Sequence, residues 1–267
     1  MVYGFIGLGS MATAIIGGMA FCGSFAEDVI CGFNRSEEKT LALSEKYGLV
    51  PKASAAEVAG ESNVLLLCVK PQVLPEVLPE VKQALRPGTL VISIAAGKTL
   101  DYFAETLGEN VPVVRIMPNL NAAVQAAVSG MAVNENVTER EKAAARQIFE
   151  QVGTVMEIPE SRFSAFTAIA GSSPAFTCMY IDALANAAAK AGMPKAQALQ
   201  AAAAAVLGSA KLLLETGEHP SAVADRVCSP GGTTIEGVLS LEKDGFAENV
   251  SRAVEAVIEK DRRLGAK

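Results

Sequence analysis

The sequence predicts an α/β protein, with a doubly wound sheet in its first part and an all-helical second part. Two observations support this prediction. Short apolar runs alternate with helical patterns as far as Ile158, which is typical of strands and helices in a largely parallel sheet. After Pro159 no convincing strand pattern remains, and long alanine-rich stretches follow. We therefore predict two domains, at 1–158 and 159–267.

Apolar runs bounded by glycine, proline or charged residues predict the strands. The run 63–69 (NVLLLCV) has no polar face, as expected of a strand buried on both sides of a parallel sheet. Thr138 and Glu141, three residues apart, form a capping box at the start of one helix. The predicted strands are 2–7, 29–33, 63–69, 89–94, 111–116, 126–133 and 154–158, and the predicted helices are 11–22, 37–47, 74–85 and 138–151, with a short one after Lys98.

The second domain is predicted to be helical and to dimerise. Its longest helical stretches are 176–191 and 194–215, and the latter contains the alanine run 201–205. Small side chains let helices approach closely, but each helix then buries little surface unless it is packed on several sides. We expect these helices to complete their core against a second copy, in a homodimer or a higher homo-oligomer.

Composition argues against several classes of function. The net charge of −6 argues against nucleic acid as a partner. His219 is the single histidine, and the five cysteines include no CxxC pair, so we expect no metal site and reduced thiols. No basic residue precedes Arg35, and glycines interrupt the N-terminal apolar stretch, which argues against a signal sequence or a membrane span. We expect a cytoplasmic protein.

The segment from Gly7 to Ala12 (GLGSMA) follows the first predicted strand and opens a helix, as in the GxGxxA turn of Rossmann dinucleotide-binding domains. Gly7 is expected to make the turn, and Gly9 to let the backbone approach a pyrophosphate. Ser10 and Met11, at the helix start, would offer backbone N–H groups to the phosphates. A turn with a purely structural role is the alternative.

The end of the second strand indicates which dinucleotide binds. A site for NAD usually has Asp or Glu there to bind the ribose 2′-hydroxyl, whereas this sequence has Asn34, Arg35 and Ser36. These groups suit a 2′-phosphate, which arginine can bind with two hydrogen bonds. We therefore predict NADPH as the cofactor, with NADH as a second donor. The alternative is that Ser36 only caps the following helix.

Three further segments follow predicted strands at the same edge of the sheet. Ligands of open α/β sheets bind at the carboxyl ends of the strands, so these segments are predicted to contact the cofactor. A solvated loop lysine is an equally good interpretation of Lys70. The segments are Val69-Lys70-Pro71, Ala95-Ala96-Gly97 and Met117-Pro118-Asn119.

The helical domain contains a second candidate anion site, at Ser229-Pro-Gly-Gly-Thr-Thr234. The Pro-Gly-Gly triplet predicts a turn, and a helix is expected to begin at Thr233 or Thr234. Backbone N–H groups at that helix start, flanked by three hydroxyls, would form a nest for an anion such as a small carboxylate. An ordinary capped turn is the alternative.

Together these motifs resemble the Δ1-pyrroline-5-carboxylate reductase family. The matching segments run through the whole chain in the family's order, and SPGGTT followed by Leu241-Glu242 is the most specific of them. They are GLGSMA at 7–12, NRS at 34–36, VKP at 69–71, AAG at 95–97, VRIMPN at 114–119, GSSPAF at 171–176 and SPGGTTIEGV at 229–238.

The resemblance implies NAD(P)H-dependent reduction of a cyclic imine, pyrroline-5-carboxylate, to L-proline. It also implies a Rossmann domain, a helical dimerisation domain, and an active site at the dimer interface with the substrate loop facing the nicotinamide. Ser229, Gly231, Gly232 and Thr233 are then expected to bind the substrate carboxylate. Thr234 is expected to place its hydroxyl on the ring nitrogen, as the catalytic residue.

The chain departs from the family's pattern at two positions. Asn121 stands where the family commonly has proline, and Ser173 replaces a glycine. Two other functions remain as alternatives. A β-hydroxyacid dehydrogenase would need a lysine on the first long helix, but 163–189 contains none. A non-catalytic dinucleotide-sensing dimer would have no use for SPGGTT.

Overall fold

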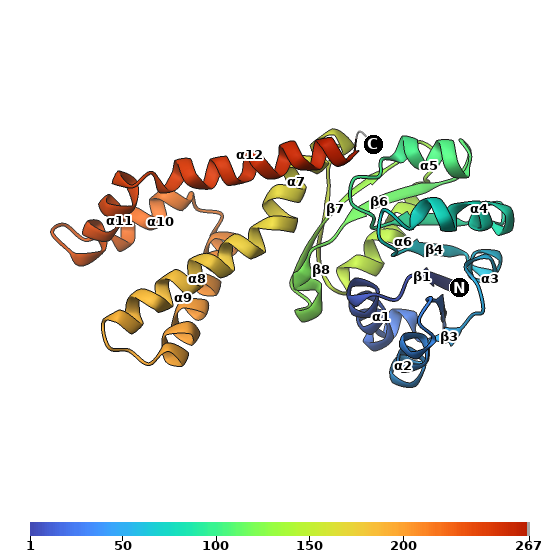
Figure 1. Ribbon diagram of the computed structural model, residues 1–267, viewed down its shortest axis with the longest axis horizontal. Coiled ribbons are helices and arrows are strands. Elements are labelled where there is room, and N and C mark those ends of the chain that lie inside the picture. Colours follow the sequence, from blue (N-terminus) through green and yellow to red (C-terminus); the bar gives the residue numbers. More distant parts are fainter. Residues whose placement is uncertain (266–267) are drawn as a thin grey trace. The chain divides into compact units, whose positions relative to one another are not determined.

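The computed structural model describes residues 1–265, with side chains as far as Arg263. Its sheet has eight strands in the order β3-β2-β1-β4-β5-β6-β7-β8 (Figure 1). The order reverses at β1, which lies between β2 and β4, as in Rossmann sheets. The strands are β1 (Val2–Ile6), β2 (Val29–Phe33), β3 (Val50–Pro51), β4 (Val64–Leu67), β5 (Leu90–Ser93), β6 (Val113–Met117), β7 (Ala127–Val133) and β8 (Gly153–Glu157).

Helices cover both faces of this sheet, which confirms the doubly wound α/β fold. Phe149 is fully buried on one face and Phe103 on the other, so each layer has its own apolar core. The capping box of α6 is confirmed, because the Thr138 hydroxyl and the Glu141 carboxylate each accept a backbone N–H of the other. The helices are α1 (Ser10–Phe21), α2 (Glu37–Tyr47) and α6 (Glu139–Glu150) on one face, and α3 (Ala55–Glu61), α4 (Leu74–Ala84) and α5 (Leu100–Leu107) on the other.

The last two strands run opposite to β1–β6, a reversal that the sequence pattern does not predict. β7 pairs antiparallel with β6, and β8 pairs parallel with β7. The nine-residue connection after β6 is too short for a crossover helix, so the chain returns beside the strand it has just left. This connection contains η2 (Leu120–Val124), and Gln125 closes it in the left-handed region, with φ 57°.

After Pro159 the described chain is helical, as predicted. It divides into two compact units, one formed by 1–171 with the residues from 257 onward and the other by 172–256. The helices are η3 (Glu160–Arg162), α7 (Phe163–Phe166), the π-helix η4 (Thr167–Ser172), α8 (Ser173–Lys190), α9 (Lys195–Thr216), α10 (Pro220–Val227), α11 (Thr233–Lys243) and α12 (Phe246–Gly265).

The second unit buries very little of its own apolar surface. Figure 1 shows α8 and α9 side by side, yet the buried residues of 172–256 are three alanines, Ala185, Ala198 and Ala202. Leu207 is 70% exposed and Leu214 is 87% exposed. By length and composition α9 could also cross a membrane. A helix whose apolar face packs on another protein surface can be equally long and apolar. This unit therefore lacks a core that its own residues complete.

Candidate active site

The glycine-rich turn after β1 has the geometry that its sequence predicts. Gly7 has φ +91°, and a Cβ atom there would lie 2.7 Å from Cγ1 of Val69. The Gly7 N–H donates to the carbonyl of Phe33 over 2.9 Å, which ties the turn to the end of β2. Ala12 is completely buried, so α1 packs closely on the sheet. Position 7 therefore requires glycine, both for its backbone conformation and because a side chain there would collide with Val69.

Gly9 stands at the start of α1 and leaves room for a ligand. A Cβ atom at Gly9 would meet nothing within 4 Å, and no side chain caps the helix at this end. The first N–H groups of a helix have no partner within it, and the helix dipole adds partial positive charge there. The turn therefore presents open space and unpaired donors, which is the arrangement that a pyrophosphate needs.

A cavity of about 580 Å³ extends from this turn along the carboxyl ends of β1, β2 and β4. Three cationic side chains line it: Arg35 after β2, Lys39 in α2 and Lys70 after β4. Glu76 and Glu80, one turn apart on α4, line it as well. The cavity thus brings together the glycine turn and two of the predicted strand-end segments, with more cationic than anionic groups.

Asn34 and Ser36 differ in what they offer to a ligand. The Asn34 side chain accepts a hydrogen bond from the Leu8 N–H (3.1 Å) and donates one to the Ser36 carbonyl (3.2 Å), so it shapes the cavity wall. Ser36 is the N-cap residue of α2, but its hydroxyl makes no capping hydrogen bond. The hydroxyl of Ser36 and the guanidinium of Arg35 are therefore the better candidates for contact with a 2′-phosphate.

The cavity also contains residues that the sequence motifs do not single out. Lys39 lies three residues beyond Ser36, within the first turn of α2. Its place one turn after the Asn34–Ser36 segment could have predicted that it faces the same cavity. Glu76 and Glu80 come from a helix with no motif, so nothing in the sequence places them here. Burial raises the pKa of the Cys68 thiol to about 12, so this sulfur stays protonated at the cavity wall.

The segments after β5 and β6 lie farther along the same edge of the sheet, outside this cavity. Ala95 is buried, Ala96 is exposed, and Gly97 has φ +73°. Asn119 is 5% exposed, and its side chain donates to the Ala170 carbonyl (2.9 Å) and accepts from the Val128 N–H (3.3 Å). The Asn119 amide thus holds the segment in place, and any ligand contact there falls to its neighbours.

The turn that the sequence predicts as an anion nest lies in the second unit, between α10 and α11. Gly231 has φ +69°, and the Gly232 N–H donates to the Ser229 carbonyl over 2.9 Å. A Cβ atom at Gly232 would collide with the Ser229 hydroxyl, so the turn needs this glycine. Helix α11 begins at Thr233, and both Thr233 and Thr234 are exposed. The first N–H groups of α11 therefore face outward beside three hydroxyls.

The sheet order, the glycine turn and the cation-lined cavity define a nicotinamide-dinucleotide-dependent oxidoreductase. A pyrroline-5-carboxylate reductase of Escherichia coli strain K12 is 43% identical over 261 residues, which cover 98% of this chain and 97% of the relative. This chain belongs to the pyrroline-5-carboxylate reductase family.

Solved structures and family models agree with this assignment. A pyrroline-5-carboxylate reductase from Coxiella burnetii superposes with a TM-score of 0.92 at 33% identity, covering 98% of this chain and 97% of that one. The Plasmodium falciparum pyrroline carboxylate reductase, solved with NADP bound, gives a TM-score of 0.86 at 28% identity over 99% and 98% of the two chains. Residues 160–264 match the pyrroline-5-carboxylate reductase dimerisation model, and residues 2–97 match a model of F420-dependent NADP oxidoreductases.

Proposed function

We propose that this chain reduces Δ1-pyrroline-5-carboxylate to L-proline with NADPH. The observation that carries the proposal is the presence in one chain of two helix starts that follow glycine turns and suit an anion. Gly9 and α1 open onto a cation-lined cavity of about 580 Å³, and α11 begins after Gly232 and the Ser229 turn. The first suits a dinucleotide and the second suits a small carboxylate. Membership of the reductase family supports the same substrate and cofactor.

The cavity residues fit NADPH. When bound, NADPH supplies the hydride that the reduction consumes. The start of α1 would bind its pyrophosphate, in the space that a side chain at position 9 would occupy. Arg35, Ser36 and Lys39 would bind the 2′-phosphate through charge-assisted hydrogen bonds, which are stronger than hydrogen bonds between neutral groups. NADH can use the same turn, but it would gain nothing from Arg35 and Lys39.

The substrate explains why the site needs little acid–base machinery. A protonated pyrroline is an iminium, whose carbon is already electrophilic, and the product amine can take a proton from water. The protein therefore has to bind the carboxylate and hold the ring in line with the donor. Ser229, Gly231, Gly232 and Thr233 would bind the carboxylate, and the Thr234 hydroxyl would contact the ring nitrogen.

We also propose that the chain acts as a homodimer or a higher homo-oligomer, free in the cytoplasm, with neither nucleic acid nor membrane as a partner. The exposed leucines of α9, among them Leu207 and Leu214, would pack on a second copy. Residues 160–264 match a dimerisation model, which supports the interpretation that a second protein chain, and not a membrane, covers α9. Sedimentation of the full chain at micromolar concentration tests this part of the proposal.

The central experiment follows NADPH oxidation with and without pyrroline-5-carboxylate. We expect oxidation to require the imine and to yield proline. The matched control is 1-pyrroline, which has the same ring but no carboxylate; its KM should be much higher, because it leaves the Ser229–Thr233 nest empty. Oxidation at the same rate without an imine, or equal KM values for the two rings, would contradict the proposal.

A further inference from the structure

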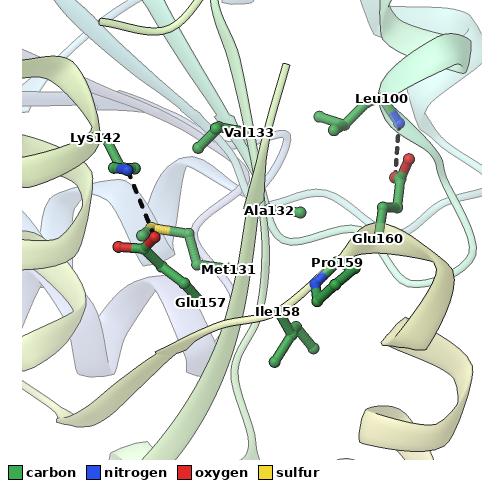
Figure 2. Close-up of a pocket in the computed structure, with 9 residues that line it drawn as sticks. All are labelled: Leu100, Met131, Ala132, Val133, Lys142, Glu157, Ile158, Pro159 and Glu160. Atoms are coloured by element: carbon green, nitrogen blue, oxygen red, sulfur yellow. Dashed lines mark hydrogen bonds and ion pairs between the residues drawn. The ribbon is translucent and has the colours of Figure 1, made fainter. Parts of the chain in front are cut away.

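The side chain of Glu160 joins three separate segments of the first unit. One carboxylate oxygen, Oε1, accepts a hydrogen bond from the Leu100 N–H (2.8 Å) and another from Nη1 of Arg115 (2.7 Å). Leu100 is the first residue of α5, Arg115 lies in β6, and Glu160 itself begins η3. Figure 2 shows the Glu160 carboxylate pointing at the Leu100 nitrogen, to one side of the strand that carries Ala132.

Each bond of Glu160 satisfies a group that would otherwise lack a partner. The Leu100 N–H is one of the first donors of α5, which have no partner within the helix, and a carboxylate there also interacts favourably with the helix dipole. The Arg115 side chain is 9% exposed, and its guanidinium carbon lies 4.3 Å from the centre of the Phe163 ring. A buried guanidinium needs a negative partner, and Glu160 provides it.

The two segments that Glu160 connects lead directly to Ala95–Gly97 and Met117–Asn119, which are predicted to contact the cofactor. Leu100 comes three residues after Gly97, and Arg115 comes two residues before Met117. β5 and β6 are neighbours, with Ser93 opposite Arg115 in the sheet. The Glu160 carboxylate therefore adds a shared anchor to two segments, Ala95–Gly97 and Met117–Asn119, that follow paired strands.

We infer that Glu160 is a positioning residue for the nicotinamide end of the cofactor site. The inference rests on the proposed function, since it takes the segments after β5 and β6 as the nicotinamide contacts. Glu160 acts through Leu100 and Arg115 and touches no reactant itself. Without it, the two segments lose their shared anchor and hold the nicotinamide less well. The cavity that would bind the 2′-phosphate lies at β1, β2 and β4 and stays unchanged.

Glu157 is a matched control for Glu160 on the same edge of the sheet. Glu157 and Glu160 both line a cavity of about 330 Å³. Figure 2 shows them on opposite sides of the strand that carries Ala132, with Glu157 paired to Lys142 (3.5 Å). Glu157 also pairs with Arg146, which is the main reason why its pKa is lowered. Its partners lie on α6, away from the segments after β5 and β6. Losing Glu157 removes two ion pairs to α6, which are more exposed than the Arg115–Glu160 pair, without touching the segments after β5 and β6.

The test compares Glu160→Ala, Glu160→Gln and Glu157→Ala in the full-length protein. The measurements are the single-turnover rate of NADPH oxidation with the imine, the Kd for NADPH, and the fluorescence of bound NADPH without substrate. For Glu160→Ala we expect a rate about tenfold lower, because small misplacement of reactants is costly, and an NADPH Kd within about twofold of wild type. Glu160→Gln keeps an oxygen acceptor for both donors but leaves the buried Arg115 without a negative partner, so it should recover only part of the rate.

Each outcome decides the inference. Support would be a slower rate and altered fluorescence of bound NADPH in Glu160→Ala, with intermediate values in Glu160→Gln and near wild-type values in Glu157→Ala. Unchanged fluorescence in Glu160→Ala would overturn it, as would equal losses in Glu160→Ala and Glu157→Ala. If the wild type does not reduce the imine, the proposed function fails while the fluorescence comparison still tests Glu160. Glu160→Asp, shorter by one methylene, serves the same test if the alanine variant does not fold.

Discussion

The two units of this chain differ in where their cores come from. The sheet unit buries large side chains on both faces, including Phe5, Phe103 and Phe149, each with no exposed surface. The unit 172–256 buries three alanines and leaves leucines such as Leu207 open. Burial of apolar area is the main force that stabilises a fold. The first unit is therefore specified by its own sequence, whereas the second needs another surface to become stable.

The largest expected effect separates the chemistry of the second unit from the cofactor site of the first. Thr234→Ala removes the hydroxyl proposed for the ring nitrogen but keeps the backbone donors of the nest. We expect turnover to fall by about ten- to a thousandfold with an unchanged NADPH Kd, because that contact acts in the transition state. Steady-state kinetics with the imine as the varied substrate measure turnover, and titration with NADPH measures the Kd.

Two further variants control for Thr234→Ala. Thr234→Ser should recover much of the rate, because the hydroxyl returns with a less restricted rotamer. Ser229→Ala should raise the KM for the imine more than it lowers turnover. Near wild-type turnover in Thr234→Ala would leave the turn as a carboxylate clamp alone.

A smaller effect is expected at the cofactor site of the sheet unit, where one substitution should affect NADPH but not NADH. Arg35→Ala should raise the KM for NADPH while that for NADH stays nearly constant. A charge-assisted bidentate contact is worth roughly 1.5–3 kcal/mol, or about ten- to a hundredfold in KM. Lys39→Ala should act in the same direction, and Lys46→Ala, at the far end of α2, is the control. Equal losses for both cofactors would refute a 2′-phosphate contact.

The third prediction tests whether the second unit borrows its core. Leu207→Asp places a charge on the exposed face of α9, and it should shift the oligomer towards monomer by about 2 kcal/mol or more if this leucine packs on a second copy. Leu41→Asp is the matched control, because Leu41 is 54% exposed on α2 of the sheet unit. Sedimentation across a concentration series measures the change. An active, folded wild-type monomer at micromolar concentration would show that the unit 172–256 is stable without a second copy.

The smallest effect concerns two serines buried in the sheet. Ser129 on β7 is fully buried, and its hydroxyl has no hydrogen-bond partner among the residues that the structure describes. The Ser93 hydroxyl on β5 accepts from the Ala95 N–H (3.2 Å). Ser129→Ala should leave the free energy of unfolding unchanged or raise it by up to about 1 kcal/mol. Ser93→Ala should lower it by about 1 kcal/mol. Urea unfolding of both variants at one protein concentration compares them, and a larger loss in Ser129→Ala would reveal a partner for its hydroxyl.

Local signals explain which elements the sequence predicts well. β2 and α2 have the limits expected, because an apolar run ends at Asn34 and because Gly48, with φ 71°, terminates the helix. β3 has two residues and one of them is Pro51, so it leaves no periodic pattern. α3 is only seven residues long, although Ser54 caps it through the Glu57 N–H. The direction of β7 depends on pairing with β6, which no local pattern reports.

The candidate site shows the same division. Gly7 and the Ser229–Thr234 turn are visible in the sequence because their backbone geometry restricts the residue type, and Gly9 is visible because it completes the GxGxxA pattern. Asn34 also stands out, yet the structure uses its amide to join β1 to the loop after β2. Glu160 is invisible in the sequence, since its partners lie 60 and 45 residues away. The sequence thus indicates site residues whose type is restricted by local geometry. It does not indicate residues, such as Glu160, whose role depends on tertiary contacts.

The uneven distribution of burial also has a consequence for synthesis of the chain. Residues emerge from the ribosome in order, and domains generally fold as units from the N-terminus. The sheet and most of its covering helices lie before residue 172, so this core can close while the rest is still being made. Helix α9 then emerges with its leucines uncovered and nothing in its own unit to cover them. Neighbouring ribosomes on one message would supply a second nascent chain at high local concentration, which shortens the interval in which this surface can aggregate.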